Sequence, residues 1–429
     1  MRFGGRLQAA IEVIEEIEKN HRPAGVALAD WGKSNRFAGS GDRAAVGNVV
    51  YDTLRTRAST AWRMGDESAR SLVMGTLVYE WGETAEEINR QFVDDKHAPE
   101  ALSGKELKKF EKTSLEDAPG WVQANIPEWL EGVFQENFDE EFIAEGEALT
   151  KRPPTDLRVN SLKADKEKVA KALTRFSPVE TPLTKSGLRL LPSEGMGRNA
   201  NVLPEAGYQK GWFEVQDAGS QIVSELVYPR SGEQILDYCA GAGGKTLAMA
   251  AQMGNKGQVH AYDVDRNRLA PIHERLKRAG TRNVQVHSPG DDLEPLKSKM
   301  DRVVVDAPCT GSGVWRRRPD SKWKLTEAAL DQRIEEQTQV LNEAAEFVKP
   351  NGYLCYITCS VLAQENEGRI YNFLEQHEDF ELLSVSEVWE DLYGMDNLQP
   401  WSTDTYSVTL TPATTQTDGF FFAVMARNS

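Results

Sequence analysis

Two cysteines and one aspartate lie where two apolar segments of the chain are expected to end. Asp306 closes one apolar run and is followed by Ala, Pro and Cys309, and Cys359 comes directly after a second run. Cys355 lies inside the second run, and a cysteine within a strand is usually a small buried apolar residue. Cys309 and Cys359 instead follow their strands, at the edge where an open α/β sheet binds its ligand. Two thiols and a carboxylate at that edge indicate chemistry at a reactive sulfur.

One reaction requires this set of groups. Carbon 5 of cytosine is a poor nucleophile toward a sulfonium methyl group, but a thiolate that adds to carbon 6 makes the ring an enamine whose carbon 5 can attack. An acid near ring nitrogen 3 offsets the developing charge, and a base must later remove the carbon 5 proton. A free thiol, with a pKa of about 8.5, is mostly protonated at neutral pH. A cation such as Lys245, or helix N–H groups, would therefore have to favour the thiolate.

A glycine-rich turn earlier in the chain supplies a second feature. Ile235 and Leu236 form a short apolar run that ends at Asp237, and a helix-forming segment begins near Thr246. The turn between them consists of Cys239, Ala240, Gly241, Ala242, Gly243, Gly244 and Lys245. Glycines let a backbone approach a ligand, and a helix N-terminus offers N–H groups to a carboxylate or phosphate.

Two nucleotide-binding patterns compete for this turn, and both fail at one position. A P-loop requires a glycine where Cys239 stands, although Gly244, Lys245 and Thr246 match its end and the strand 302–306 could serve as its magnesium-binding strand. The dinucleotide fingerprint requires its third glycine where Thr246 stands. An adenosyl-type cofactor with its methionine end over the glycines remains, beside a turn of purely structural use.

Acids at two further strand ends could complete such a cofactor site. Asp263 follows the second expected strand and could accept hydrogen bonds from both ribose hydroxyls. It could instead cap the next helix, although Asp265 is also placed for that role. Asp291, near the end of the third strand, could contact an adenine amino group, and on spacing Asp292 is an equal choice.

Composition sets the class of the protein. The chain of 429 residues is 40% hydrophobic and 27% charged, which predicts a soluble globular protein of two or three domains. It has no apolar run of about 18 residues and begins with an acidic amphipathic segment, so we expect neither a membrane span nor a secretory signal. Its four cysteines and its histidines lack the spacing of a disulfide framework or a metal site, which favours the cytoplasm. The net charge of −16 argues against indiscriminate nucleic-acid binding but allows a local basic face.

Periodicity predicts three domains. Residues 1–120 form a helical domain, with helical spacing over 44–55 and 71–79, helical character to residue 112 and a polar linker at 103–120. Residues 121–212 contain a linker helix and a small α/β subdomain with a strand, a helix and a strand. An acidic segment at 127–148, with eight acids and no Lys or Arg, is expected to be a solvated helix face away from any RNA. Residues 213–429 alternate strands and helices in a doubly wound sheet. Its expected strands are 234–239, 258–263, 284–287, 302–306, 352–358, 379–384 and 419–426.

The motifs at these strand ends resemble those of one enzyme family. Residues 237–246, 306–313 and 358–360 are similar to the signature motifs of the RsmB/Nop2/Sun-type RNA 5-methylcytosine methyltransferases. Further matches are at residues 215–221, 317–323, 365–366 and 418–421, so the resemblance extends over about residues 150–429 in the order of the family. Ala242 departs from the family, which commonly has proline there. A methyltransferase acting on an amino group would carry an aromatic residue in place of Cys309.

The resemblance implies a fold, a cofactor and roles for the site residues. The fold would be a Rossmann-like methyltransferase domain that binds S-adenosylmethionine through Cys239–Lys245, Asp263, Asp291 and Asp306. Cys359 would be the nucleophile, Cys309 would assist a later step such as proton removal or release, and Asp306 would hold the cytosine edge. Lys245 is the candidate for favouring the thiolate.

The first domain is weakly similar to the NusB-like RNA-binding domain of the bacterial RsmB branch. That branch implies 16S rRNA as the substrate and a monomer without metal, with transfer RNA or a P-loop NTPase as alternatives. Six basic residues lie between Arg266 and Arg282, and a second basic cluster, interleaved with Trp315 and Trp323, follows Cys309. We expect RNA phosphates to contact the second cluster, which consists of Arg316, Arg317, Arg318, Lys322 and Lys324. The target base must leave its stack to reach Cys359.

Overall fold

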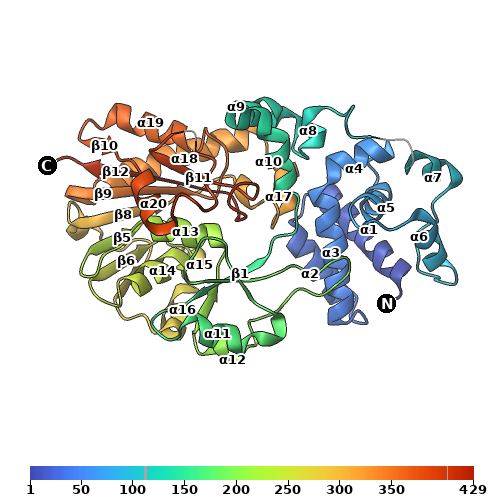
Figure 1. The fold of residues 1–429 in the computed structure, drawn as a ribbon, viewed down its shortest axis with the longest axis horizontal. Coiled ribbons are helices and arrows are strands. Elements are labelled where there is room, and N and C mark those ends of the chain that lie inside the picture. Colours follow the sequence, from blue (N-terminus) through green and yellow to red (C-terminus); the bar gives the residue numbers. More distant parts are fainter. Residues whose placement is uncertain (111–113, 403) are drawn as a thin grey trace. The chain divides into compact units, whose positions relative to one another are not determined.

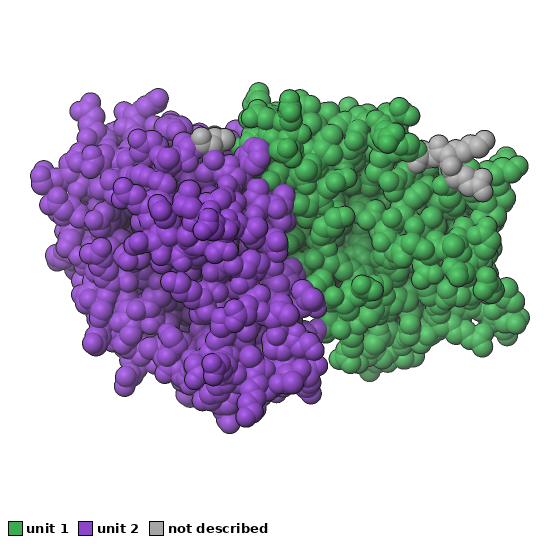
Figure 2. Space-filling model, viewed as in Figure 1, with its two compact units in different colours: residues 1–153, 192–199, 315–325 green, residues 154–191, 200–314, 326–429 purple. Residues whose placement is uncertain are grey.

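The computed structural model describes residues 1–110, 114–402 and 404–429 of the chain. They form two compact units, which Figure 2 shows in green and purple. Unit 1 comprises residues 1–153, 192–199 and 315–325, and unit 2 comprises residues 154–191, 200–314 and 326–429. Two segments of unit 1 therefore come from the later part of the chain. The division into domains at 1–120, 121–212 and 213–429 stays a prediction.

Unit 1 is built of helices. Its first two long amphipathic helices, α1 and α3, pack with α5 around a core that includes Leu7, Ile14, Val46 and Val73. The predicted helices at 44–55 and 71–79 are confirmed as α3 and α5. Figure 1 labels the α-helices of this unit. Its helices are α1 (Phe3–Asn20), α2 (Ala24–Ser34), α3 (Ser40–Arg55), α4 (Arg57–Met64), α5 (Ala69–Tyr79), α6 (Ala85–Phe92), α7 (Gly104–Phe110), α8 (Gly120–Gln123), η1 (Glu128–Leu130), α9 (Glu131–Phe138), η2 (Asp139–Glu141), α10 (Phe142–Ala148) and α17 (Pro319–Lys324).

Two segments of this unit differ in part from what the sequence predicted. The polar stretch at 103–120 was expected to be a linker, but α7 is helical because Ser103 and Glu106 cap its start, with Ser103 N–H donating to Glu106 over 2.8 Å. Residues 111–113 lie outside the described residues, and with them the end of the predicted helical stretch. The acidic segment 127–148 folds as four short helices that bury Phe134 and Phe138. Most of its acids are exposed, as expected of a solvated face, whereas Glu145 is buried.

Unit 2 begins with a small antiparallel sheet of order β2-β3-β1-β4. The predicted strand, helix and strand are confirmed, and Leu157 pairs with Leu188 on one side and Val215 on the other. The short strands β2 and β4 were not predicted. The elements of this subdomain are β1 (Thr155–Val159), α11 (Lys166–Ala172), η3 (Thr174–Phe176), β2 (Val179–Glu180), β3 (Gly187–Leu190), α12 (Ala206–Gln209) and β4 (Phe213–Val215).

The rest of unit 2 is a doubly wound sheet of order β10-β12-β9-β8-β5-β6-β7, with β11 paired to β12. Strands β5 to β9 are parallel and β12 runs antiparallel to β9. The predicted strands are confirmed, and β11 was missed. The strands are β5 (Gln234–Asp237), β6 (Gln258–Tyr262), β7 (Val284–His287), β8 (Met300–Asp306), β9 (Val348–Thr358), β10 (Phe380–Leu382), β11 (Ser407–Leu410) and β12 (Phe420–Arg427).

Helices cover both faces of this sheet (Figure 1). One core joins α13, α14 and α20 to residues such as Ile235 and Val304, and the other joins α18 and α19 to Leu236 and Val305. The order of the strands reverses between β5 and β8, which is where such sheets bind ligands. The helices are α13 (Ala218–Leu226), α14 (Gly244–Gln252), α15 (Arg266–Leu269), α16 (Ile272–Ala279), η4 (Glu294–Leu296), η5 (Ser312–Val314), α18 (Glu327–Ala345), α19 (Glu367–Gln376) and α20 (Ser386–Tyr393).

Candidate active site

The glycine-rich turn connects β5 to α14 and lies close against α16. Gly241 and Gly243 have φ values of 50° and 81°, a region in which a residue with a Cβ is strained. A Cβ on Gly243 would also lie 2.5 Å from Cγ1 of Ile272. The sharp turn therefore requires glycine at these positions, and it presents backbone rather than side chains at the start of α14.

A cavity of about 480 Å³ lies over this turn, a size within the range of about 300–1,000 Å³ typical of small-molecule sites. Of the residues predicted to bind the cofactor, Cys239, Ala240, Gly241, Ala242, Gly244, Lys245 and Asp306 line it. Gln216 and Arg268 also contribute. The amide of Gln216 accepts a hydrogen bond at 2.6 Å from Nε of the buried Arg158. A cavity with backbone amides, one carboxylate and one ammonium suits a nucleoside that carries an amino acid.

The other three predicted cofactor ligands, Gly243, Asp263 and Asp291, lie outside this lining. Asp263 is buried, and its two oxygens accept the N–H groups of Gly241 at 2.9 Å and Asp265 at 2.8 Å. It therefore braces the glycine turn from the end of β6. Asp265 caps α15 by accepting the N–H of Asn267 at 2.8 Å. Asp291 is exposed and accepts the N–H of Ser288 at 2.7 Å.

Lys245 and Asp306 form an ion pair at the mouth of the site. Nζ of Lys245 lies 2.6 Å from Oδ2 of Asp306 and 5.3 Å from the centre of the Phe420 ring. The lysine side chain is 9% exposed, whereas that of Asp306 is 33% exposed. The ammonium group is thus held by Asp306, whose carboxylate remains accessible from the cavity.

Asp237, at the end of β5, is fully buried beneath this pair. Its Oδ2 accepts the hydroxyl hydrogen of Thr246 at 2.6 Å. Its Oδ1 is buried and has no hydrogen-bond partner among the described residues. Burial, with a smaller contribution from Asp306, raises the pKa of Asp237 to about 7. A carboxyl with one unpartnered oxygen in an apolar setting is favoured in its neutral form.

The two cysteines that follow β8 and β9 are in contact. The sulfurs of Cys309 and Cys359 lie 3.3 Å apart, and both residues are half-buried. The hydrogen bond to Cys359 and burial of its sulfur raise the pKa of Cys309 well above its ordinary value. Cys239 is also half-buried, and burial and the charge of Asp306 raise its pKa. Cys355 is buried in the sheet, as the sequence indicated.

The loops that carry Cys309 and Cys359 are joined by hydrogen bonds. Gly313 N–H donates to the carbonyl of Cys359 at 3.0 Å, and the hydroxyls of Ser312 and Ser360 lie 2.8 Å apart. Both serines lie in the family motifs at 306–313 and 358–360, but no role was predicted for either, because a serine after a strand does not indicate its partner. The contacts fix the two sulfurs relative to each other.

Comparison with known proteins identifies the family of this site. A profile for the 16S rRNA methyltransferases RsmB/F matches residues 224–426, and a ferredoxin-like domain profile of RsmF/B-like methyltransferases matches residues 126–193. The chain is 33% identical over 330 residues, 75% of its length, to a probable ribosomal RNA small subunit methyltransferase B of Synechocystis, of which the match covers 70%. The chain belongs to the RsmB/F methyltransferase family.

Solved structures agree with this assignment. A methyltransferase homologue from Pyrococcus horikoshii is 26% identical, with a TM-score of 0.59 over 73% of this chain and 100% of that one. The protein PH0851 shares the fold over 99% of both chains, with a TM-score of 0.74 and 23% identity. RsmB/F enzymes use S-adenosylmethionine, and the cavity over the glycine turn fits that cofactor. The P-loop NTPase alternative receives no support from the family.

The basic cluster predicted to bind RNA lies in unit 1 of this RsmB/F chain. Arg316 and Lys322 are buried, Arg317 and Lys324 are half-buried, and Arg318 is exposed. Nζ of Lys322 donates to the carbonyl of Arg55 at 3.1 Å, and burial lowers its pKa to about 7. These contacts give Arg316 and Lys322 structural roles in this arrangement. RNA binding by the cluster stays a prediction.

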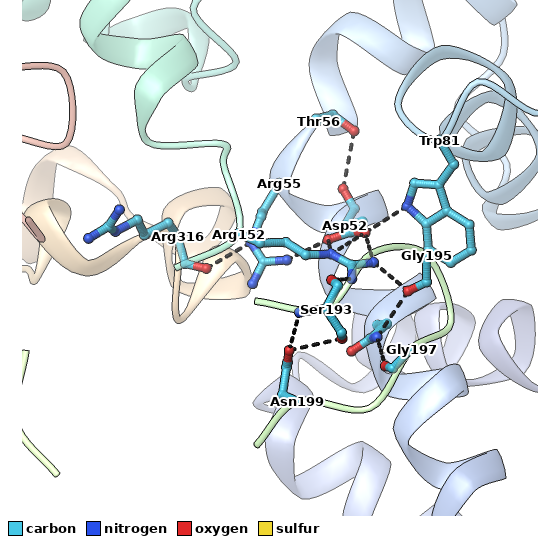
Figure 3. Close-up of polar contacts among 11 residues, drawn as sticks. Asp52, Arg55, Thr56, Trp81, Arg152, Ser193, Gly195, Gly197, Asn199 and Arg316 are labelled. Carbon is cyan, nitrogen blue, oxygen red and sulfur yellow. Dashed lines mark hydrogen bonds and ion pairs between the residues drawn. The ribbon is translucent and has the colours of Figure 1, made fainter. Parts of the chain in front are cut away.

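A buried network on α3 explains why two late segments belong to unit 1 (Figure 3). Asp52 accepts hydrogen bonds from Arg55 at 2.6 Å, from Trp81 at 2.7 Å and from Arg152 at 2.5 Å. Arg152 also donates to the carbonyls of Ser193 and Gly195, which holds the segment 192–199. Nε of Arg55 donates at 2.7 Å to the carbonyl of Arg316 and so holds the segment 315–325.

The first basic cluster, at 266–282, is partly neutralised. Arg275 and Arg278 pair with the buried Glu214 at 3.0 and 2.7 Å, while Arg266, Arg268 and Lys277 are exposed. Across residues 1–110, 114–402 and 404–429 the structure brings together no group of His, Cys, Asp and Glu that could hold a metal ion. No described helix is long and apolar enough to cross a membrane.

Proposed function

We propose that this chain methylates carbon 5 of a cytosine in RNA, through a covalent bond between Sγ of Cys359 and carbon 6 of the base. The observation that carries the proposal is the contact of 3.3 Å between the sulfurs of Cys309 and Cys359. They follow adjacent parallel strands, and Asp306 at the end of one of these strands lines the cofactor cavity. Chemistry at an exocyclic amino group has no use for two thiols.

Each of these residues has a separate role in the reaction. The Cys359 thiolate adds to carbon 6, which leaves an enamine that can attack from carbon 5. S-adenosylmethionine supplies an electrophilic methyl group on a sulfonium centre. Asp306, one edge of which is accessible, holds the edge of the cytosine at ring nitrogen 3. Cys309, in contact with the nucleophile, acts in the later step that restores the free enzyme.

Lys245 acts in this site through its ion pair with Asp306. The ion pair at 2.6 Å fixes the carboxylate that must meet the base, and the ammonium group offsets negative charge that develops nearby. From its sequence position, Lys245 was one candidate for favouring the thiolate, beside helix N–H groups. Its pairing with Asp306 supports a role in orienting the carboxylate instead.

The family name supports the RNA of the small ribosomal subunit as the substrate. We propose 16S rRNA, and transfer RNA would require the same chemistry. The target cytosine must be unstacked, so an unpaired nucleotide is expected. We expect the enzyme to act as a monomer in the cytoplasm.

Two cysteine variants test the mechanism. Cys359→Ala should abolish methylation and retain S-adenosylmethionine binding, which calorimetry measures. Cys309→Ala should accumulate a covalent protein–RNA adduct, visible as a shifted band on a denaturing gel. Full turnover by Cys359→Ala would refute the assignment of the nucleophile. Bisulfite sequencing of 16S rRNA from a deletion strain, with and without the gene restored, identifies the modified cytosine.

A further inference from the structure

A fully buried carboxylate, that of Glu365, lies against the loop that carries Cys309. Its oxygens accept two hydrogen bonds from Thr310, from the backbone N–H at 2.8 Å and from the hydroxyl at 2.5 Å. A third comes from the side-chain amide of Gln337 on α18, at 2.9 Å. These contacts all lie within unit 2.

Glu365 and Gln337 together hold the residues on both sides of Cys309. Glu365 fixes Thr310, the residue after the cysteine. The amide of Gln337 also donates to the carbonyl of Pro308, the residue before it, at 2.9 Å. Three consecutive residues are therefore fixed at two points, which leaves little freedom for the direction of the Cys309 side chain.

The charge of Glu365 has no counter-ion among the described residues, since its contacts are to neutral groups. Burying such a carboxylate is costly unless its hydrogen bonds are strong, and bonds to an ionised acceptor are shorter and stronger than neutral ones. The contact with Cys359 and burial raise the pKa of Cys309, and the charge of Glu365 raises this pKa further. Cys309 is thereby kept as a thiol that can donate to the sulfur of Cys359.

We propose that Glu365 is a positioning residue for Cys309 in the release step of methyl transfer. This inference rests on the proposed function. In that step the carbon 5 proton leaves to solvent, its electron pair forms the C5–C6 double bond, and the C6–S bond breaks. The electron pair of that bond stays on the sulfur of Cys359, to which the Cys309 thiol donates a hydrogen bond. Glu365 holds Cys309 where this donation is possible.

The test compares Glu365→Ala with its conservative counterpart. Glu365→Ala removes the three hydrogen bonds and should accumulate the covalent adduct, as Cys309→Ala does. It should lower kcat and KM for RNA together, because slowing a step after adduct formation leaves kcat/KM unchanged. Glu365→Gln keeps an oxygen for the Thr310 N–H, and its new N–H can donate to the Thr310 hydroxyl. Glu365→Gln should therefore restore release. Gels run after quenching with denaturant measure the adduct fraction.

Two controls separate positioning from loss of stability. Asp301 lies at the opposite end of β8 from Asp306, and its carboxylate accepts the backbone N–H of Gln234 at 2.7 Å. Asp301→Ala should therefore destabilise the fold but should not accumulate the covalent adduct. The double variant Glu365→Ala, Cys309→Ala should accumulate no more adduct than Cys309→Ala alone, because both changes act on one group. Additive adduct levels, or adduct in Asp301→Ala, would refute the positioning role.

RNA with 5-fluorocytidine at the target distinguishes this inference from the proposed function. Fluorine cannot leave as a proton does, so a cytosine-5 enzyme is trapped on such RNA whatever the state of Cys309. If the wild-type enzyme forms no adduct with it, the proposed function fails. If the wild-type enzyme is trapped but Glu365→Ala releases natural RNA normally, only the role of Glu365 fails. Should Glu365→Ala not fold, Thr310→Ala, which removes only the hydroxyl contact, should give a smaller increase in adduct.

Discussion

Replacing Asp237 with asparagine should change how the stability of the protein depends on pH. The carboxyl is fully buried, and burial raises its pKa from 3.8 to about 7. Below a pH of about 4 both the folded and the unfolded chain carry the proton. As the pH rises from about 4 to about 7, only the unfolded chain releases the proton, so the free energy of unfolding falls over this interval. Above a pH of about 7 the contribution of Asp237 no longer changes with pH.

The magnitude follows from the difference between the two pKa values. A difference of about 3 corresponds to about 4 kcal/mol, which is the full effect above pH 7. Between about pH 5 and about pH 8 the free energy of unfolding of Asp237→Asn should therefore rise by roughly 2–3 kcal/mol relative to the wild type. Asparagine can accept the Thr246 hydroxyl as Asp237 does, and the cost of its unpartnered amide is independent of pH.

Urea unfolding followed by tryptophan fluorescence, at several pH values across this interval, measures the difference. Asp301→Asn is the matched control with the opposite sign. Burial raises the pKa of Asp301, but the Gln234 N–H and Lys349 outweigh it, so its pKa is lowered overall. That control should lose stability relative to the wild type as the pH rises through 4. A stability difference for Asp237→Asn that does not vary with pH would show that Asp237 is ionised in the folded protein, against the reasoning from burial.

Three further predictions concern charged side chains. Lys322→Met should leave RNA affinity within about twofold, because the amine is buried. Arg318→Ala, at an exposed position, should weaken binding and remove one phosphate contact, which contributes about −0.9 to the slope of log K against log salt concentration, or about −0.7 if the RNA is single-stranded. Filter binding at several salt concentrations measures both variants. Lys245→Met should lower kcat for methylation by a factor of about 10²–10³, the loss typical of removing one preorganised charge or donor, in a single-turnover assay. Asp52→Ala leaves the buried guanidinium group of Arg55 and the half-buried one of Arg152 without their carboxylate partner and should cost about 3–5 kcal/mol of unfolding free energy, measured by urea titration.

The positions of Cys309 and Cys359 were predictable because parallel strands end at one edge of a sheet. A motif that follows one strand must therefore lie near a motif that follows its neighbour. The same reasoning placed Asp306 at this edge, where it lines the cavity over the glycine turn, and its contact with the cofactor stays a prediction. For Asp263 the sequence suggested a hydrogen-bond acceptor for ribose, whereas its oxygens accept backbone N–H groups. Which donor a carboxylate meets depends on loop geometry that spacing does not contain.

The environment of the second basic cluster could not be predicted. Lysines and arginines are rarely buried, so Lys322 and Arg316 suggested a surface. Lys322 donates to the carbonyl of Arg55, and the carbonyl of Arg316 accepts from Nε of Arg55. The neighbouring Trp315 stacks on the ring of Phe134, with centres 6.0 Å apart. These partners are distant in the sequence, so a local sequence pattern cannot predict them. Residues 365–366 matched a family motif, but the role of Glu365 was not predictable for the same reason, since its partners come from the loop after β8 and from α18.

Three carboxyl groups at the ends of β5, β6 and β8 surround the glycine turn, and the structure gives each a different partner. Asp237 is buried and favours its neutral form, which avoids an unpaired charge in the core. Asp263 is satisfied by two backbone N–H groups. Asp306 alone among these three lines the cavity, where the ion pair with Lys245 orients it without covering it. A cytosine that reaches Cys359 would therefore meet one available carboxylate, and that is the acid which the proposed chemistry needs at ring nitrogen 3.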